Sequence, residues 1–397
     1  MRKHPSSPMA VLAILMLILA ACSSDGGESP SEAAESQPAG SEPAASEPAE
    51  SEAPTSDLKI GVVTDVGTVN DKNFNEYTYL GAVQGAETIG AAEPPVTVPN
   101  DDSEYASAIQ AYVDQGFDII VSAGFNLGVA TTQAAHDNPD IWFIGVDQGP
   151  PCVDAEGLPD LTFACAGDAA ALLPQYIALS YQEDQAGYLA GMVAASVSET
   201  GTIGAVGGIT LCGPCIRYMQ GYILGAESIN PDINVVTAFV TESDFTKAFN
   251  DPVTGTSFGG QFIQQNPEVD VLFQVAGKTG NGILDAACEA QILGVGVDVD
   301  QALSYPNAAP CIVTSATKSL SLAVLTNIQA IADGSAQGGD DHWDASRDGV
   351  GYAPFHDNES LVPADLEAQL DEAFQAMKDG SLETCPEACG DISTLQN

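Results

Sequence analysis

From residue 59 onward the pattern of apolar and polar positions alternates between two kinds of segment. Short apolar runs, typical of strands buried on both faces, occupy residues 59–66, 118–124, 141–147, 202–208, 234–240, 269–276 and 292–298. Longer segments of helical length lie between them, at residues 73–89, 183–197, 217–229 and 280–291. This alternation predicts parallel sheets covered by helices. Because the series runs twice, before and after about residue 181, we expect an α/β chain of two doubly wound lobes.

Three of the apolar runs end in an aspartate, namely Asp65, Asp147 and Asp298. A single Asp in such a place is often a helix cap or a turn former, and that alternative stays open for each of them. In doubly wound sheets, however, ligands bind beyond the carboxyl ends of the strands. We therefore expect the three carboxylates to line one cleft.

The first residues have the order of a secretory leader. The basic Arg2 and Lys3 precede an uncharged apolar stretch at residues 11–19, and the motif LAAC follows and ends in Cys22. The stretch is shorter than the roughly 20 residues of a membrane-spanning helix, so residues 1–21 are predicted to be a cleaved signal peptide. LAAC resembles the bacterial lipobox, which implies a lipid on Cys22. A plain signal peptide with an incidental cysteine is the alternative.

Residues 22–56 consist mostly of Ser, Glu, Ala, Pro and Gly and contain no aromatic residue. Such a segment cannot bury enough apolar area to order itself, so it is predicted to be a disordered acidic tether. The whole chain carries a formal net charge of −45, which argues against nucleic acid and anionic lipid surfaces as partners. We expect contact with the cell membrane only through the lipid on Cys22, at the extracytoplasmic face, and folding from Asp57 onward.

The remaining cysteines come in sequence-neighbouring pairs. They are Cys152 and Cys165, Cys212 and Cys215, Cys288 and Cys311, and Cys385 and Cys389. Structural disulfides are the default in an exported chain, but eight cysteines allow 105 pairings, and the choice of neighbours rests on proximity alone. The chain has only four histidines and no zinc-like His/Cys spacing. We expect no metal and no cofactor.

The segment TDVGTVNDKNFNE at residues 64–76 resembles the basic membrane protein family of ABC-transporter substrate-binding lipoproteins, which includes the purine nucleoside receptor of spirochaetes. The likeness continues in the family's order through EDQAGYLAGMVAA from residue 183, TIGAVGG from 202, FNDPVTG from 249, FQVAGKTGNG from 273, GVDVDQ from 296 and TSATKSL from 314. It implies a type I periplasmic binding protein, in which two lobes joined by three crossovers close on the ligand about a hinge. Lobe 1 is then expected to hold residues 57–182 and about 299–330, and lobe 2 residues 183–298 and about 331–397.

The same resemblance implies that aromatic rings hold the ligand. Phe74 and Phe249, one from each lobe, would stack on the two faces of a nucleobase, and a flat apolar face suits a planar ring. Backbone amides around Gly277 would add donors. Core packing is the alternative for each Phe, but Phe74 lies among polar residues and Phe249 precedes a turn signal, which favours a cleft wall.

Polar side chains would complete the implied site. Asp65, Asn75 and Asp147 would meet the base or its neighbourhood. Asp298 and Lys318 would meet the ribose, because a carboxylate accepts from two vicinal hydroxyls and a lysine donates back.

The implied function is capture of a nucleoside, a purine nucleoside first of all, by a monomeric binding protein that is not an enzyme and that passes its ligand to an ABC permease. The chain departs from the family pattern in its cysteines, in an insertion at residues 150–167 beside Asp147, and in Lys278 in a Gly-rich turn, and these departures leave the ligand open. A simple sugar or another small polar metabolite is the alternative.

Two enzymatic alternatives have less support. Paired carboxylates can catalyse hydrolysis, but no motif places a nucleophile beside a His. CGPC, residues 212–215, is also the redox motif of thioredoxins, but it lacks the aromatic residue that precedes the motif there, and a structural bridge is expected in an exported chain.

Overall fold

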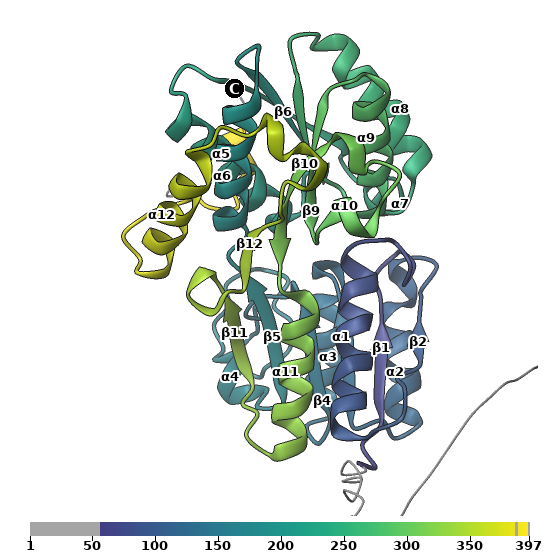
Figure 1. Cartoon of the computed structure of the whole chain (residues 1–397). Helices are drawn as coiled ribbons and strands as arrows, with labels where there is room; N and C mark the ends of the chain where they lie inside the picture. Colours follow the sequence, from purple (N-terminus) through teal and green to yellow (C-terminus); the bar gives the residue numbers. More distant parts are fainter. Residues whose placement is uncertain (1–55, 386–387, 396–397) are drawn as a thin grey trace, which may run out of the picture. The chain divides into compact units, whose positions relative to one another are not determined.

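The computed structural model describes residues 56–385 and 388–395. The predicted signal peptide (1–21), Cys22 and the tether up to residue 55 lie outside these residues. In the described part, two six-stranded sheets form the centres of two α/β lobes (Figure 1), which confirms the predicted class. No helix of the described part is long and apolar enough to cross a membrane.

Lobe 1 is built on a sheet with the strand order β11-β5-β4-β3-β1-β2, in which every pair is parallel. Its strands are β1 (Ile60–Val63), β2 (Val96–Thr97), β3 (Ile119–Ala123), β4 (Trp142–Val146), β5 (Tyr176–Tyr181) and β11 (Gly339–Trp343). Its helices are α1 (Phe74–Ile89), α2 (Tyr105–Asp114), α3 (Gly128–Asp137), α4 (Ala169–Leu172) and α11 (Leu320–Asp333), with 3-10 turns η1 (Asp102–Glu104) and η2 (Phe125–Leu127).

Lobe 2 has the strand order β12-β10-β9-β8-β6-β7, parallel except for the short edge strand β12. Its strands are β6 (Thr202–Ile209), β7 (Asn234–Thr241), β8 (Val271–Val275), β9 (Leu293–Asp298), β10 (Ile312–Lys318) and β12 (Val350–Tyr352). Its helices are α5 (Glu183–Val197), α6 (Gly213–Ile229), α7 (Phe245–Phe249), α8 (Pro252–Gln265), α9 (Gly277–Glu289), α10 (Gln301–Ser304) and α12 (Leu366–Lys378), with 3-10 turns η3 (Ala309–Cys311), η4 (Ala345–Arg347), η5 (His356–Leu361) and η6 (Ile392–Leu395).

Alternate residues of each buried strand face opposite helical layers. In lobe 1, Ile60 and Val62 of β1 belong to the core that includes α1 and α11, while Val63 belongs to the core beneath α2 and α3. In lobe 2, Ile203 of β6 packs toward α5 and α6, and Val206 toward α8 and α9. Burial on both faces explains why the strands read as continuous apolar runs.

The chain crosses between the lobes three times, and two crossings differ from the predicted lobe boundaries. The first, between β5 and α5, lies at the expected residue 182. The second was expected near residue 299, but β10 is hydrogen-bonded to β9, so residues 299–318 belong to lobe 2. The chain then enters lobe 1 with α11, and β11 keeps it there to residue 343 instead of about 330. It returns to lobe 2 before β12.

Helices α5 and α6 lie against each other through glycines. A Cβ atom at Gly187 or Gly191 of α5 would overlap a backbone carbonyl of α6, and one at Gly221 or Gly225 of α6 would overlap a backbone carbonyl of α5. The two backbones therefore touch along two turns. This contact fixes the start of both helices, and both starts lie near the other lobe.

The structure joins the cysteines in the predicted neighbouring pairs, which are Cys152–Cys165, Cys212–Cys215, Cys288–Cys311 and Cys385–Cys389. The pairing that proximity suggested is therefore confirmed. Each bridge links residues close in sequence, so none ties one lobe to the other and the hinge stays free of covalent restraint.

Candidate functional site

A cavity lies where the carboxyl ends of the two sheets face each other. Its empty volume, including the open solvent at the mouth, is about 560 Å³. Lobe 1 lines it with Asp65, Asp71, Phe74, Asn75, Gly124, Phe125 and Asp147, and lobe 2 with Cys212, Pro214, Cys215, Tyr218, Phe249, Val275, Gly277, Val297, Asp298 and Lys318. All eight residues singled out from the sequence are among them, namely Asp65, Phe74, Asn75, Asp147, Phe249, Gly277, Asp298 and Lys318.

Strand order explains why these side chains meet. β1, β3 and β4 are neighbours in lobe 1, so Asp65 and Asp147 end up at one edge of the sheet. In lobe 2, β9 and β10 are paired with Thr317 opposite Asp298, so Lys318, the next residue, lies beside Asp298. Parallel strands end at the same edge of a sheet, which brings residues far apart in sequence into one site.

Asp71 positions the lobe 1 wall. Its carboxylate accepts hydrogen bonds from the backbone N–H groups of Asn73, Asn75 and Glu76 at 2.9, 2.9 and 3.1 Å. These groups lie at the start of α1, where helical N–H groups have no partner within the helix. The cap fixes Phe74 and Asn75 in the first turn, and Asn75 donates from Nδ2 to Asp65 at 3.1 Å.

Lys318 connects the two lobes through a buried group of charges. Its Nζ lies 2.7 Å from Asp147 of lobe 1, and 3.1 Å from Asp298 and 3.9 Å from Glu183 of lobe 2. The lysine side chain is only 1 % exposed. Arg217 pairs with the other oxygen of Glu183 at 2.7 Å. Three carboxylates and two cations are thus paired in this buried group, while Asp147 Oδ1 and Glu183 Oε1 accept no hydrogen bond from the described residues.

The backbone at two of the predicted aspartates has a left-handed conformation. The φ angles of Asp147 and Asp298 are 59° and 63°, which costs a non-glycine residue about 1–3 kcal/mol and is concentrated at functional sites. Both carboxylates bind Lys318, and Asp298 also accepts from the Tyr218 hydroxyl at 3.2 Å. Asp65 accepts from Asn75. The helix-cap alternative therefore does not apply to these three residues.

Burial changes the ionisation of the site. It raises the pKa of Asp65 to about 7, against the hydrogen bond from Asn75, which lowers it. Burial also raises the pKa of Asp71 to about 6, although three backbone N–H groups lower it. For Lys318, burial lowers the pKa, but the surrounding carboxylates outweigh this and raise it above its usual value. The lysine stays charged while Asp65 titrates near neutrality.

We expect Asp65→Asn to reduce the dependence of folding stability on pH. The folded protein keeps a proton on Asp65 up to a pKa of about 7, whereas the ordinary value is 3.8. The free energy of unfolding of the wild type therefore falls as the pH rises between these values. Asparagine does not titrate, so its stability lacks this dependence on pH. Between pH 4.5 and 6.5 the free energy of unfolding of the variant, relative to that of the wild type, should therefore rise by about 2 kcal/mol.

Urea unfolding at several pH values measures this difference. Asp140→Asn, which changes an exposed carboxylate, is the control and should follow the wild type at every pH. If the free energy of unfolding changes with pH in the same way for Asp65→Asn and the wild type, the claim that burial raises the pKa of Asp65 is contradicted.

Uncharged side chains also join the lobes. Gln274 donates to Gln301 at 2.6 Å, Gln301 donates to Asn281 at 3.0 Å, and Asn281 donates to the carbonyl oxygen of Asp71 in lobe 1 at 3.0 Å. Ser304 donates to the carbonyl oxygen of Lys72 at 2.7 Å. The lobes are therefore in hydrogen-bonded contact at the rim of the cavity, as in a closed trap.

Sequence reasoning missed several residues of the site. Gly124 and Phe125 follow β3, and a Cβ at Gly124 would lie 2.7 Å from Asp65 Oδ2, with φ at 106°, so only glycine fits. The apolar run 118–124 ends there, so the strand-end argument already applied to it. Tyr218 and Glu183 gave no comparable signal, because both lie within helices.

Two of the departures from the family pattern, the insertion and Lys278, lie outside the cavity. Cys152–Cys165 closes the insertion at residues 150–167, and no residue of this insertion lines the cavity. Lys278 does not line it either, although its neighbour Gly277 does. The insertion and Lys278 therefore make no direct contribution to the lining of the cavity.

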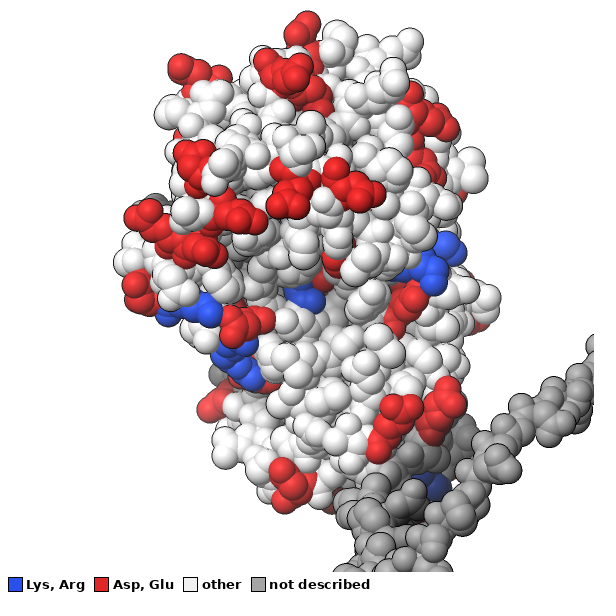
Figure 2. All heavy atoms as spheres, in the orientation of Figure 1, with Lys and Arg blue, Asp and Glu red and all other residues white. Residues whose placement is uncertain are grey.

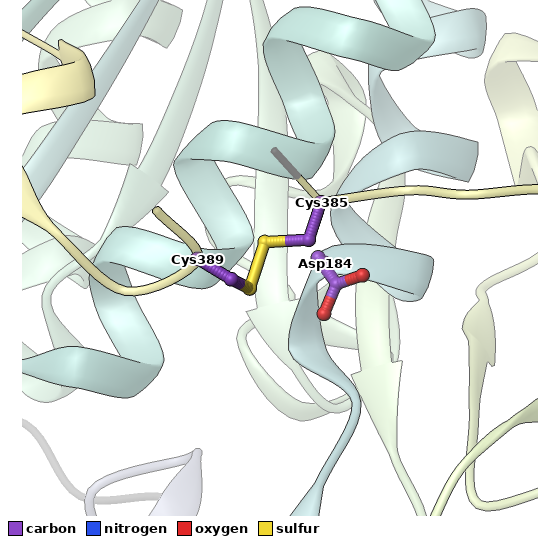
Figure 3. A group of neighbouring side chains, drawn as sticks. All are labelled: Asp184, Cys385 and Cys389. Atoms are coloured by element: carbon purple, nitrogen blue, oxygen red, sulfur yellow. A yellow bond between two sulfur atoms is a disulfide. The ribbon is translucent and has the colours of Figure 1, made fainter. Parts of the chain in front are cut away.

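Asp184, Cys385 and Cys389 are a group of potential metal ligands in the described part of the chain (Figure 3). The two sulfur atoms are joined in a disulfide, so neither is a thiolate. The carboxylate of Asp184 accepts hydrogen bonds from Gln182 and Thr384. The hydrogen bond from Thr384 to Asp184 therefore attaches the C-terminal segment, which contains the Cys385–Cys389 disulfide, to the start of α5.

Comparison with known proteins identifies relatives along most of the chain. A family model described as "ABC transporter substrate-binding protein PnrA-like" matches residues 58–381. The "ABC transporter nucleoside-binding protein BmpA" of Lactococcus lactis subsp. cremoris is 29 % identical over 257 residues, which cover 62 % of this chain and 65 % of that protein, slightly less than two thirds of its length. Basic membrane protein A1 of Borrelia garinii subsp. bavariensis is 27 % identical over 321 residues, covering 79 % of this chain and 84 % of that protein.

A solved structure of an ABC transporter solute-binding protein from Aeropyrum pernix K1 has the same two-lobed fold. It superposes with a TM-score of 0.69 at 21 % identity and covers 82 % of this chain and 92 % of that one. A solute-binding protein from Actinobacillus succinogenes 130z with bound D-allose superposes with a TM-score of 0.56 at 14 % identity, covering 76 % and 99 %. At these identities the likeness shows the fold alone, which confirms the predicted periplasmic binding architecture.

Proposed function

Because the chain belongs to the family of PnrA-like ABC transporter substrate-binding proteins, we propose that it captures a nucleoside, a purine nucleoside first of all, and passes it to an ABC permease. It acts as a binding protein and not as an enzyme. Closure of the lobes buries the ligand, and the closed form is the one that the permease receives.

The observation that carries this proposal is the combination of groups in the cavity. Phe74 of lobe 1 and Phe249 of lobe 2 both line it, so aromatic surface is available from opposite sides. The paired Asp298 and Lys318 lie in the same cavity. Rings suit a planar base, and an acceptor beside a donor suits the vicinal hydroxyls of ribose. A nucleoside contains both parts.

Two buried acceptors favour a ligand that carries hydrogen-bond donors. Within the described residues, Oδ1 of Asn75 and Oδ1 of Asp147 are buried and have no hydrogen-bond partner in the protein. A buried acceptor without a donor costs about 1–3 kcal/mol, so both atoms favour a ligand that brings hydrogen-bond donors. The N–H groups of a base meet this need, and so do the hydroxyls of a sugar, so the preference for a base rests on the two aromatic rings.

Charge and the relatives narrow the ligand further. Acidic side chains spread over the face of the protein seen in Figure 2, and four carboxylates line the cavity, which disfavours nucleotides because their phosphates are anionic. The Lactococcus lactis relative is a nucleoside-binding protein by name. The lipid on Cys22 would hold the protein at the extracytoplasmic face, where an importer collects its solute.

Calorimetry with nucleosides, bases and sugars tests the proposal. We expect a nucleoside to bind, and Phe74→Ala and Asp298→Ala each to weaken its binding at least about tenfold, or about 1.4 kcal/mol. Phe163→Ala is the matched control, because Phe163 is 81 % exposed and lies outside the cavity. Its affinity should equal that of the wild type.

Three results contradict parts of this proposal. Binding of a sugar without any nucleoside removes the nucleoside assignment and supports the sugar alternative. Unchanged affinity in both cavity variants rejects the cavity as the site. A product formed from incubated nucleoside assigns an enzyme instead.

A further inference from the structure

The disulfide Cys212–Cys215 lies in the wall of the cavity. Both cysteines line it together with Pro214 and Tyr218 of the same helical turn. They are only 3 % and 4 % exposed. The six cysteines of the other three disulfides are not among the lining residues, so this pair differs from them in position.

The disulfide closes the first turn of α6. Cys212 is the N-cap of this helix, and its sulfur accepts the backbone N–H of Cys215 at 3.1 Å. Tyr218 follows Cys215 by three residues, on the same side of the helix. Its hydroxyl donates to Asp298 at 3.2 Å, so the turn that the disulfide closes also orients the carboxylate proposed to hold the sugar.

Burial argues against a role in electron transfer between proteins. Thiol–disulfide exchange needs an attacking thiolate to reach a sulfur atom. With the lobes in contact, both cysteines are buried in the wall of an interlobe cavity that a protein substrate cannot enter. Only a small molecule reaches them, and only when the lobes part. The position of the CGPC motif is therefore better suited to contact with the ligand of the cavity than to thiol–disulfide exchange with another protein.

We propose that the Cys212–Cys215 disulfide is a ligand-contacting part of the cavity wall and that its reduction weakens ligand binding. This inference rests on the proposed function, because it adds a determinant to the same site. A small dithiol is the reductant. Its two thiols supply two electrons and two protons, the Cys212–Cys215 S–S bond breaks, two S–H groups form, and the reductant closes to its own disulfide.

Weaker binding follows from what the bond holds in place. Two free thiols cannot remain as close as two bonded sulfur atoms, and the packed interior behind them leaves the cavity as the space into which they move. The first turn of α6 also loses its cross-link, which loosens the Tyr218 hydroxyl against Asp298. Ligand contact and ligand orientation are both affected.

Calorimetry on the full-length protein tests the contact. We expect Cys212→Ser/Cys215→Ser to weaken binding of whichever panel member binds the wild type at least about tenfold. The control Cys152→Ser/Cys165→Ser removes a disulfide that lines no part of the cavity, and its affinity should stay within about twofold of the wild type. Equal affinities of the two variants overturn the inference.

Protection from reduction is a second measurement that needs no variant. A dithiol is added with and without saturating ligand, and the freed thiols are alkylated and counted by mass spectrometry for each pair. Ligand should slow reduction of Cys212–Cys215 at least about tenfold and leave Cys152–Cys165 unchanged. Equal rates with and without ligand overturn the inference.

The outcomes separate this inference from the proposed function. If a sugar protects Cys212–Cys215 from reduction and no nucleoside binds, the contact between disulfide and ligand is supported and the nucleoside assignment is rejected. Suppose instead that a nucleoside binds, that the Cys212→Ser/Cys215→Ser variant keeps its affinity and that the ligand gives the disulfide no protection. That result rejects the contact between disulfide and ligand and leaves the proposed function intact. If no panel member binds, both are rejected.

Discussion

Lys318→Met is expected to weaken ligand binding at least about a hundredfold and to lower the free energy of unfolding by about 3–5 kcal/mol. The ammonium group of Lys318 lies among Asp147, Asp298 and Glu183, and its side chain is 1 % exposed. Methionine fills much of the same space but carries no charge, so Asp147 and Asp298 lose their buried cation. An uncompensated buried carboxylate is one of the few causes of so large an effect.

Ligand binding should be weakened for a related reason. Lys318 holds Asp147 of lobe 1 and Asp298 of lobe 2 at the same time, so its loss removes one of the contacts that keep the lobes closed, together with the donor that we propose for the ligand. Urea unfolding and calorimetry measure the two effects separately.

Two further variants sharpen this prediction. Lys247→Met makes the same change at a surface pair with Asp244, in which the lysine side chain is 57 % exposed, and should lower the free energy of unfolding far less than Lys318→Met does. Lys318→Met/Asp147→Asn should recover part of the lost stability, because one unpaired carboxylate is removed. A Lys318→Met protein as stable as Lys247→Met would show that the buried charges do not depend on the lysine.

Much of the site was predictable because its position follows from local sequence. A continuous apolar run ending in Asp marks the carboxyl end of a buried strand, and Asp147 and Asp298 each occupy such an end. Sheet order then brings strand ends together without further instruction. Phe74 also lines the cavity, at the start of α1, but it was expected there from the family resemblance and its polar neighbours and not from the end of a strand.

The second crossover could not be predicted in the same way. The segment Ile312–Lys318 reads as a strand, but nothing within it says that β9 is its partner. Pairing depends on residues far away in sequence, so the predicted return to lobe 1 near residue 299 was about 20 residues too early. Glu183 was missed for a similar reason, since its buried carboxylate is explained only by Arg217 and Lys318.

The second large effect is expected for Gly221→Ala in α6, which should lower the free energy of unfolding by about 3 kcal/mol or more. A Cβ at this position would overlap the backbone carbonyl of Asp184 in α5. Backbone atoms cannot rotate away as a side chain can, so the helices must separate. Urea unfolding followed by circular dichroism measures the loss.

Gly260→Ala in α8 is the matched control, because a Cβ there meets nothing within 4 Å. It should stabilise the protein by roughly 0.5–1 kcal/mol, since alanine is the better helix former. The same chemical change is thus expected to have opposite signs in two helices of one lobe. Because α6 begins at the cavity wall and α5 begins with Glu183, Gly221→Ala should also weaken ligand binding, whereas Gly260→Ala should leave it unchanged. Equal stabilities of the two variants would contradict the backbone contact between α5 and α6, and with it the mechanism that holds the lobe 2 wall in place.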